Sequence, residues 1–138
     1  MSEHYEIVLF TASTQPYAEA IVQSLDPEGL TINYILHRAH CFETRNGYAI
    51  KDLRIIKNRD LKNILIVDNL VHSFGLQISN GIPILEWEGN EHDTELKHLA
   101  EYLLEAKDAD NLADFNSKRL KLKEFAAIPN FESWINGF

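Results

Sequence analysis

The stretch that decides the fold is Ile64-Leu65-Ile66-Val67-Asp68-Asn69. Four branched apolar residues in a row predict a core strand over Ile64–Val67, buried on both faces of an α/β sheet. This strand ends on a carboxylate and an amide. Because open α/β sheets bind ligands outside the carboxyl ends of their strands, we expect Asp68 and Asn69 to lie at a ligand-binding edge.

Two other segments direct polar groups to the same edge. The strand expected at Ile7–Phe10 ends on Thr11, whose hydroxyl and following backbone N–H groups could hold a phosphate oxygen near a helix start. Lys51 supplies a compact positive charge that can neutralise phosphate. Asp68 and Asn69 offer the oxygen ligands that Mg²⁺ prefers. The predicted phosphoryl-handling site is formed by Thr11, Ala12, Lys51, Asp68 and Asn69.

Each of these residues also has a purely structural interpretation. Thr11 could serve merely as a helix cap, and Lys51 could be a solvated surface residue. An Asp-Asn pair often starts a turn. A zinc site at His37, His40 and Cys41 is disfavoured because no second pair with ligand spacing follows. The combination of groups, rather than any one of them, therefore favours phosphate chemistry.

The rest of the pattern alternates strands and helices. A helix with one apolar face at Tyr17, Ile21 and Leu25 follows the first strand, and Asn46-Gly47 predicts a hairpin turn. The further expected elements are strands at Ile32–Leu36 and Ile82–Leu85, a helix capped by Asp93 with apolar positions from Leu96 to Leu104, and a basic helix from Leu112 to Leu122. This order predicts an α/β fold with a mostly parallel sheet, right-handed crossovers and a small antiparallel insertion.

The bulk composition limits the possible functions. The chain has 138 residues, 45% of them hydrophobic, and a net charge of −8. Such an acidic balance argues against a broad nucleic-acid surface, and no segment approaches the ~18 apolar residues of a membrane span. A lone cysteine, Cys41, fits a reducing compartment, so we expect an intracellular protein, nuclear or cytoplasmic. We predict one domain over residues 1–126 and an aromatic tail over residues 127–138 that packs on it.

Several stretches occur in a recognisable order along the chain: Tyr5 to Ser13 with Tyr17-Ala18, His37-Arg38 with Cys41, Tyr48 to Leu53, Arg59 to Asn69, Ser73-Phe74, Asn80 to Ile84, and Asp93 to Leu96. Together they resemble the NLI-interacting-factor-like phosphatases, the small carboxyl-terminal-domain and dullard-like phosphatases of the haloacid dehalogenase superfamily. The resemblance covers residues 3 to 125. It implies a three-layer Rossmann-like fold and a Mg²⁺-dependent protein serine/threonine phosphatase that works through an aspartyl-phosphate intermediate.

The resemblance also implies roles for individual residues. Thr11 matches the phosphate-binding hydroxyl of the second family motif, and Lys51 matches the phosphate-neutralising lysine of the third. Asn69 matches the Mg²⁺ ligand of the fourth, with Asp68 beside it ordering the lysine or the metal shell. The expected partner is a protein that carries phosphoserine or phosphothreonine.

The catalytic first motif of the family is missing from the sequence. That motif, Asp-x-Asp-x-Thr, carries the nucleophile and the general acid, and the only Asp-x-Asp here, Asp108-Ala109-Asp110, follows a helix rather than a strand. In the family its strand lies mid-sheet, between the strands that end at Thr11 and Asn69. We therefore expect an amino-terminally truncated domain with Met1 an internal methionine, unpaired strand edges and little catalysis alone. An in-frame stop codon close upstream, with no Asp-x-Asp-x-Thr in any adjoining exon, would contradict this.

Two alternatives to an enzyme fragment stay open. One is a catalytically dead module that binds a phosphopeptide or a protein through the remaining phosphate cradle. The other is a fold completed in trans, by self-association or by a strand from another chain, because unpaired strand edges invite pairing.

Overall fold

β1 (Ile7–Phe10) and β2 (Ile32–Leu36) form a parallel pair in the computed structural model, which describes residues 1–122. Both strands have the bounds that their apolar runs predict. α1 (Gln15–Leu25) connects them as a crossover helix. The proposed domain end at residue 126 and the tail at 127–138 lie outside the described residues.

The second parallel pair consists of β5 (Ile66–Asp68) and β6 (Gly81–Pro83). Both strands differ from the sequence prediction. β5 begins two residues later than expected, because Ile64 closes the preceding 3₁₀ turn at Leu61–Asn63. β6 ends before Leu85, whose side chain is 72% exposed.

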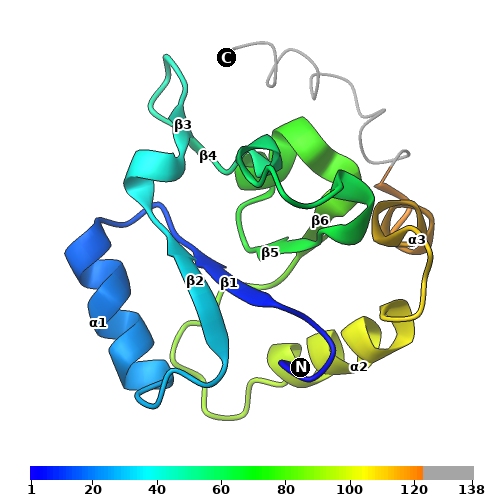
Figure 1. Cartoon of the computed structure of the whole chain (residues 1–138), viewed down its shortest axis with the longest axis horizontal. Helices are drawn as coiled ribbons and strands as arrows, with labels where there is room; N and C mark the ends of the chain where they lie inside the picture. The colour runs from blue at the N-terminus through cyan, green and yellow to red at the C-terminus, as the bar shows by residue number, and fades with distance from the viewer. Residues whose placement is uncertain (123–138) are drawn as a thin grey trace.

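The two parallel pairs do not join into one sheet. Among residues 1–122, β1 is hydrogen-bonded only to β2, and β5 only to β6. In Figure 1, β1 lies between the labels of β2 and β5, with its second edge turned to the other half of the molecule. Within residues 1–122, β1 and β5 of this α/β arrangement therefore each have one edge without a strand partner.

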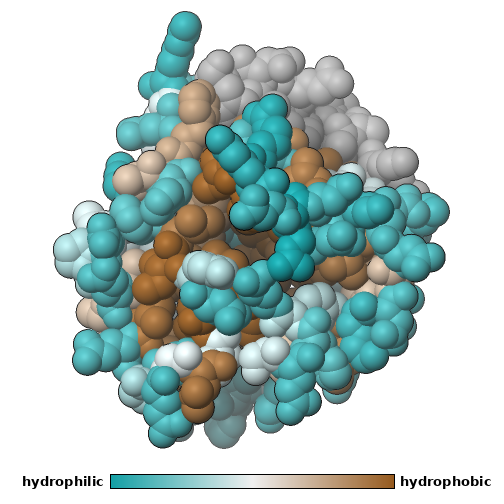
Figure 2. Space-filling view, viewed as in Figure 1, coloured by the Kyte–Doolittle hydropathy of each residue, from teal (hydrophilic) through white to brown (hydrophobic). Residues whose placement is uncertain are grey.

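Apolar surface gathers around the β1–β2 pair. Figure 2 shows hydrophobic residues over β1, β2 and the adjoining side of α1, ringed by hydrophilic ones. Val8 on β1 keeps 37% of its surface exposed. The part of the chain that the structure describes thus leaves apolar area uncovered in its first half.

The polar excursion forms the predicted hairpin. β3 (Phe42–Glu43) pairs antiparallel with β4 (Ala49–Ile50). Gly47 supplies the positive φ of 81° that its turn requires. β4 packs against the Val71–Asn80 segment that follows β5, so that Lys51, just after β4, reaches Asp68 at the end of β5.

The helices exist as predicted, but the apolar face assigned to α1 is exposed at every predicted position, and the face assigned to α2 (Glu95–Ala106) is only partly buried. In α1 the buried residue is Ala18, while Tyr17 and Leu25 are 60% and 70% exposed. In α2 the predicted positions Leu99, Ala100 and Leu103 are half-buried, whereas Leu96 is 72% exposed. Periodicity assigned these residues to one apolar face, but the described residues leave Tyr17, Leu25 and Leu96 exposed.

The helix caps and the last helix are close to prediction. Thr94 occupies the N-cap position of α2 without a side-chain cap hydrogen bond, and the predicted cap Asp93 accepts a hydrogen bond at Oδ1 from the Glu95 amide at 2.9 Å. α3 spans Leu112–Arg119, and the Asn111 side chain accepts a bond from the Asp114 amide. No helix among residues 1–122 is long and apolar enough to cross a bilayer.

Two asparagines fix the segment between β5 and β6. This segment is mostly 3₁₀ helix (Val71–Asn80), interrupted at Phe74 and Gln77. Asn116, fully buried on α3, donates to the carbonyls of Ser79 and Gly81 at 2.9 and 2.8 Å. Asn80 donates to two carbonyls of the Leu61–Ile64 turn. These hydrogen bonds hold the segment in place, and its own Phe74 packs with Leu53 and Ile66 in the core.

Gly81 is required by this packing. A Cβ built there would meet the Phe74 ring at 2.1 Å, and the ring is fully buried. We expect Gly81→Ala to destabilise the domain by about 2–3 kcal/mol through overpacking, measured by urea denaturation. Because the clash is with the ring, Phe74→Leu in the same chain should recover part of that loss. Strictly additive destabilisation in the double variant would show that the contact is not the cause.

Candidate functional site

A buried ion pair forms the centre of the polar edge. Lys51 Nζ lies 2.5 Å from Asp68 Oδ2, and the two side chains are only 12% and 6% exposed. The Lys51 amide donates to the Ser73 carbonyl at 2.7 Å, and Asp68 Oδ1 accepts from the Leu70 amide at 2.9 Å. Lysine and carboxylate are therefore fixed by backbone bonds as well as by each other.

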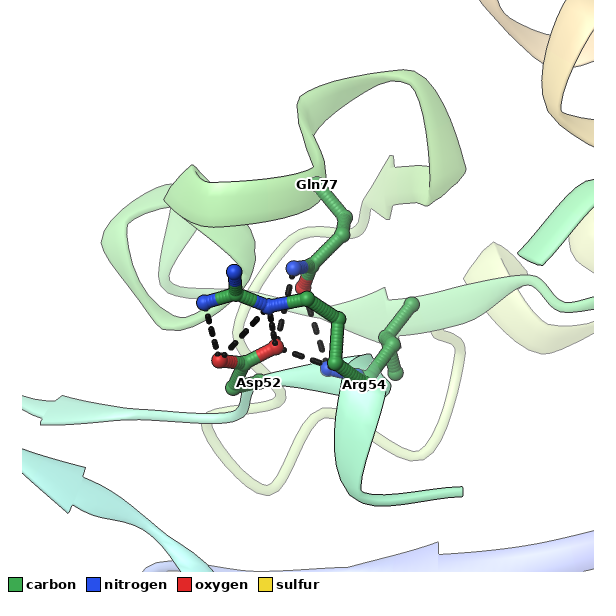
Figure 3. A network of polar contacts seen from close by, with 4 residues as sticks. Asp52, Arg54 and Gln77 are labelled. Carbon is green, nitrogen blue, oxygen red and sulfur yellow. Dashed lines mark hydrogen bonds and ion pairs between the residues drawn. The ribbon is translucent and has the colours of Figure 1, made fainter. Parts of the chain in front are cut away.

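A polar cluster next to Lys51 fixes the chain that follows it (Figure 3). The Asp52 carboxylate accepts bonds from the backbone and guanidinium of Arg54 and from Gln77 Nε2, with distances of 2.7–3.1 Å. Gln77 Oε1 in turn accepts from the buried Leu53 amide at 3.0 Å. The hydrogen bonds from Arg54 hold the pKa of Asp52 below its usual value. The cluster anchors the short 3₁₀ turn at Leu53–Ile55 against the Val71–Asn80 segment.

The first strand delivers its hydroxyl to the same edge. The Thr11 amide donates to Leu36 of β2, and Thr11 Oγ1 accepts from the Ser13 amide at 3.1 Å. Lys51 Nζ lies 5.8 Å from the centre of the Phe10 ring, so the end of β1 is close to the ion pair. Within the described chain the Ala12 amide has no hydrogen-bond partner, which leaves a backbone donor available beside the hydroxyl.

Asn69 directly follows Asp68 of the ion pair. It is exposed, and it lines a cavity of about 570 Å³ together with nine residues between Ile84 and Leu96. Thr11, Lys51, Asp68 and Asn69 are thus brought to one edge of the two strand pairs. Their functional roles remain predictions.

The described residues do not offer enough free oxygen ligands to hold Mg²⁺ on their own. This ion takes six oxygen ligands, commonly with one or two carboxylates. Asn69 can offer one amide oxygen, but the neighbouring Asp68 carboxylate is already used by Lys51 and Leu70. Residues 1–122 also contain no cluster of three or more histidine, cysteine or acidic side chains arranged for a metal. The ion would need carboxylates from elsewhere.

His37, His40 and Cys41 have local structural roles. The histidines cap one 3₁₀ turn reciprocally, since His40 Nδ1 accepts from the His37 amide and His37 Nδ1 from Ala39. Cys41 Sγ lies 3.9 Å from the carbonyl oxygens of Thr11 and His37. Burial raises the pKa of the Cys41 thiol, which keeps it protonated at neutral pH. This disfavours a thiolate nucleophile.

Ser73 and Gln77 are site residues that reasoning from residue types missed. Ser73 presents its carbonyl to Lys51, and its buried Oγ has no hydrogen-bond partner among the described residues. Gln77 bridges Asp52 and Leu53. No local pattern marks either residue, because both act through contacts more than 20 positions away.

A comparison with protein-family models shows which family the chain belongs to. The model of the NLI interacting factor-like phosphatases matches residues 1–114. The chain belongs to this family. The resemblance inferred from the order of the sequence motifs is confirmed.

Individual relatives carry two kinds of name. CTD small phosphatase-like protein 2 of Dictyostelium discoideum is 41% identical over 103 residues, covering 75% of this chain and 18% of that protein. Mitochondrial import inner membrane translocase subunit TIM50 of Kluyveromyces lactis is 42% identical over 105 residues, covering 75% and 22%. The chain therefore spans about a fifth of the length of these two curated relatives.

Solved structures confirm the fold. Fission yeast RNA polymerase II CTD phosphatase Fcp1-R271A bound to beryllium fluoride superposes with a TM-score of 0.52 at 20% identity, over 88% of this chain and 31% of that one. At this identity the likeness concerns the haloacid dehalogenase fold alone.

Removing Lys51 tests the ion pair. Lys51→Ala should destabilise the domain by about 2–4 kcal/mol, because it leaves the Asp68 carboxylate buried without its counter-charge. Lys51→Met combined with Asp68→Asn should recover most of that loss, because no buried charge remains. Urea denaturation measures both variants. Equal stability of Lys51→Ala and the unmodified chain would show that the pair is not desolvated in solution.

The Asp52 cluster predicts an acid-sensitive contribution to stability. A carboxyl whose pKa is lowered on folding stabilises the domain above its unfolded pKa, about 3.9, and loses that effect as pH falls through the folded pKa. Asp52→Asn keeps a capping side chain but lacks the charge. It should be less stable by about 1 kcal/mol at pH 6, since Arg54 is largely exposed, and the difference should shrink as the pH falls through the folded pKa of Asp52. A difference that stays the same as the pH is lowered from 6 to well below about 3.9 would assign the effect to packing.

Proposed function

We propose that this chain carries the phosphate-binding half of a Mg²⁺-dependent protein serine/threonine phosphatase site. The observation that carries the proposal is the Lys51–Asp68 pair at the strand ends, with the Thr11 hydroxyl and the Ala12 amide beside it. Phosphoryl transfer depends mainly on positioned charges and donors around the phosphate oxygens. Lys51 would neutralise the phosphoryl group, Thr11 and Ala12 would bind its oxygens, and Asn69 would contribute one metal ligand.

The nucleophile has to come from outside the given sequence. None of the 138 residues forms an Asp-x-Asp-x-Thr motif on a strand. The unpaired edges of β1 and β5 offer a place for a further parallel strand whose carboxyl end would lie beside Lys51 and Asn69. Such a strand would also bring the carboxylates that Mg²⁺ lacks here. We propose that the chain is inactive without it.

Turnover assays test the proposal. With p-nitrophenyl phosphate and Mg²⁺, the 138-residue chain should show no turnover. A strand bearing Asp-x-Asp-x-Thr, fused ahead of residue 1, should confer Mg²⁺-dependent turnover. In that fusion Lys51→Met should lower kcat by about 100-fold or more, because it removes charge stabilisation of the transition state. Robust turnover by the unfused chain, or a folded but inert fusion, would contradict the proposal.

A matched lysine variant provides the control for this experiment. Lys62 is exposed on the turn before β5 and takes no part in the site. Lys62→Met removes the same charge from the chain, so turnover of the fusion should stay within about twofold of the unmodified fusion, because a single exposed charge is largely screened. Equal losses for Lys51→Met and Lys62→Met would point to net charge rather than to the site.

A second candidate function is a catalytically dead module that binds a phosphopeptide or a protein. Two observations favour it: the missing aspartates, and relatives named as subunits of a mitochondrial import translocase rather than as phosphatases. Both functions use the same cradle. They differ in that a binding module needs no nucleophile, so it would bind a phosphoserine peptide while the fused strand adds no turnover.

A further inference from the structure

A groove lies next to Asn69, outside the residues that contact phosphate in the proposed function. Its volume is about 570 Å³, and its wall is formed by residues that follow β6 and begin α2. We call it the Trp87 groove. Its apolar lining consists of Ile84, Leu85, Trp87 and Leu96.

The apolar side chains of the groove are unusually open to solvent. Leu85, Trp87 and Leu96 are 72%, 68% and 72% exposed. The indole N–H of Trp87 is already satisfied by the Asn90 carbonyl at 3.0 Å, so the ring presents apolar surface and its π face. Large exposed apolar side chains that share one concave surface are typical of a binding site.

The rim of the groove is acidic. Glu86, Glu91, Asp93 and Glu95 line it, and no lysine or arginine does. The Asp93 carboxylate is partly occupied by the Glu95 amide, but Glu86 and Glu91 are exposed. A lining of apolar and acidic side chains, with no basic residue among the described ones that form it, complements a segment that carries cationic and apolar side chains.

We propose that the Trp87 groove binds the part of a protein substrate that flanks the phosphorylated residue, and that this part carries arginine or lysine next to an apolar side chain. The proposal rests on the proposed function, because Asn69 is shared by the phosphate site and the groove. An apolar side chain would pack on Leu85 and Leu96. A guanidinium would lie against the rim carboxylates or over the Trp87 ring.

Four synthetic peptides test this proposal by fluorescence anisotropy with the 138-residue chain. Each peptide has nine residues with a central serine followed by a leucine and two charged residues. The charged residues are arginine or glutamate, and the serine is phosphorylated or unmodified. We expect the arginine peptides to bind at least about tenfold more tightly than the glutamate peptides at low salt, with the ratio falling as salt screens the charges.

Variants locate the binding in the groove. Trp87→Ala should weaken the arginine peptides by about tenfold, as expected for an aromatic anchor. Glu86→Gln with Glu91→Gln should reduce the arginine preference, whereas Glu88→Gln, in the same loop but outside the lining, should leave it unchanged. Trp87→Phe should keep most of the affinity, which guards against a folding defect in the alanine variant.

The peptide set separates the two proposals. Tighter binding of the arginine peptides than of the glutamate peptides, without any effect of the phosphate, would contradict the proposed function but support the proposal for the groove. A phosphate effect with equal affinity for arginine and glutamate peptides would overturn the groove. Loss of preference in Glu88→Gln equal to that in the double variant would also overturn it, because net charge would then explain the result. So would no binding of either arginine peptide at millimolar concentration.

Discussion

The Lys51–Asp68 ion pair is the contact on which the polar edge depends. It joins the residue that leaves β4 to the last residue of β5, and the same ammonium lies near Phe10 of β1. Hydrogen bonds between strands do not link the two parallel pairs among residues 1–122. Side-chain contacts must therefore set the distance between the two halves at this edge.

A buried ion pair is a costly way to hold two segments together. The desolvation of both charges often cancels their attraction, and an apolar pair of the same shape would be as stable. What the ion pair provides is a fixed location for a positive charge beside a hydroxyl and an exposed amide. The Asp52 cluster has a similar effect one residue later, because its several hydrogen bonds fix the backbone that follows Lys51.

Strands, helices and the gathering of the site residues could be predicted from the sequence because they depend on local patterns. β1 and β2 have the bounds of their apolar runs, and the hairpin follows from Asn46-Gly47. The buried helix faces could not be predicted in this way. Periodicity identifies a face rich in leucine at Leu96 and Leu104, but it does not reveal whether another element covers it.

The contacts that depend on distant partners were also beyond sequence reasoning. Gln77 and Asn116 are ordinary polar residues by type, yet each is buried and satisfies backbone groups that are 24 to 37 positions away. Family membership does not supply the missing information about function either. The same fold is shared by relatives named as phosphatases and as translocase subunits, so the assignment has to come from the site.

The electrostatics of the chain constrain what that site can bind. The net charge is −8, and the one lysine in the cradle is already compensated by Asp68. In the proposed function, a bare phosphate would therefore meet a cradle that is close to neutral, inside a chain that repels it at long range. Binding then requires donors at short range, such as the Ala12 amide and the Thr11 hydroxyl, or cationic groups that arrive with the phosphate. A substrate whose flanking residues are basic would bring such groups and place them on the acidic rim beside Asn69. The acidity of the chain, which argues against a nucleic-acid partner, is thus compatible with a phosphorylated protein whose own charges offset those of the site.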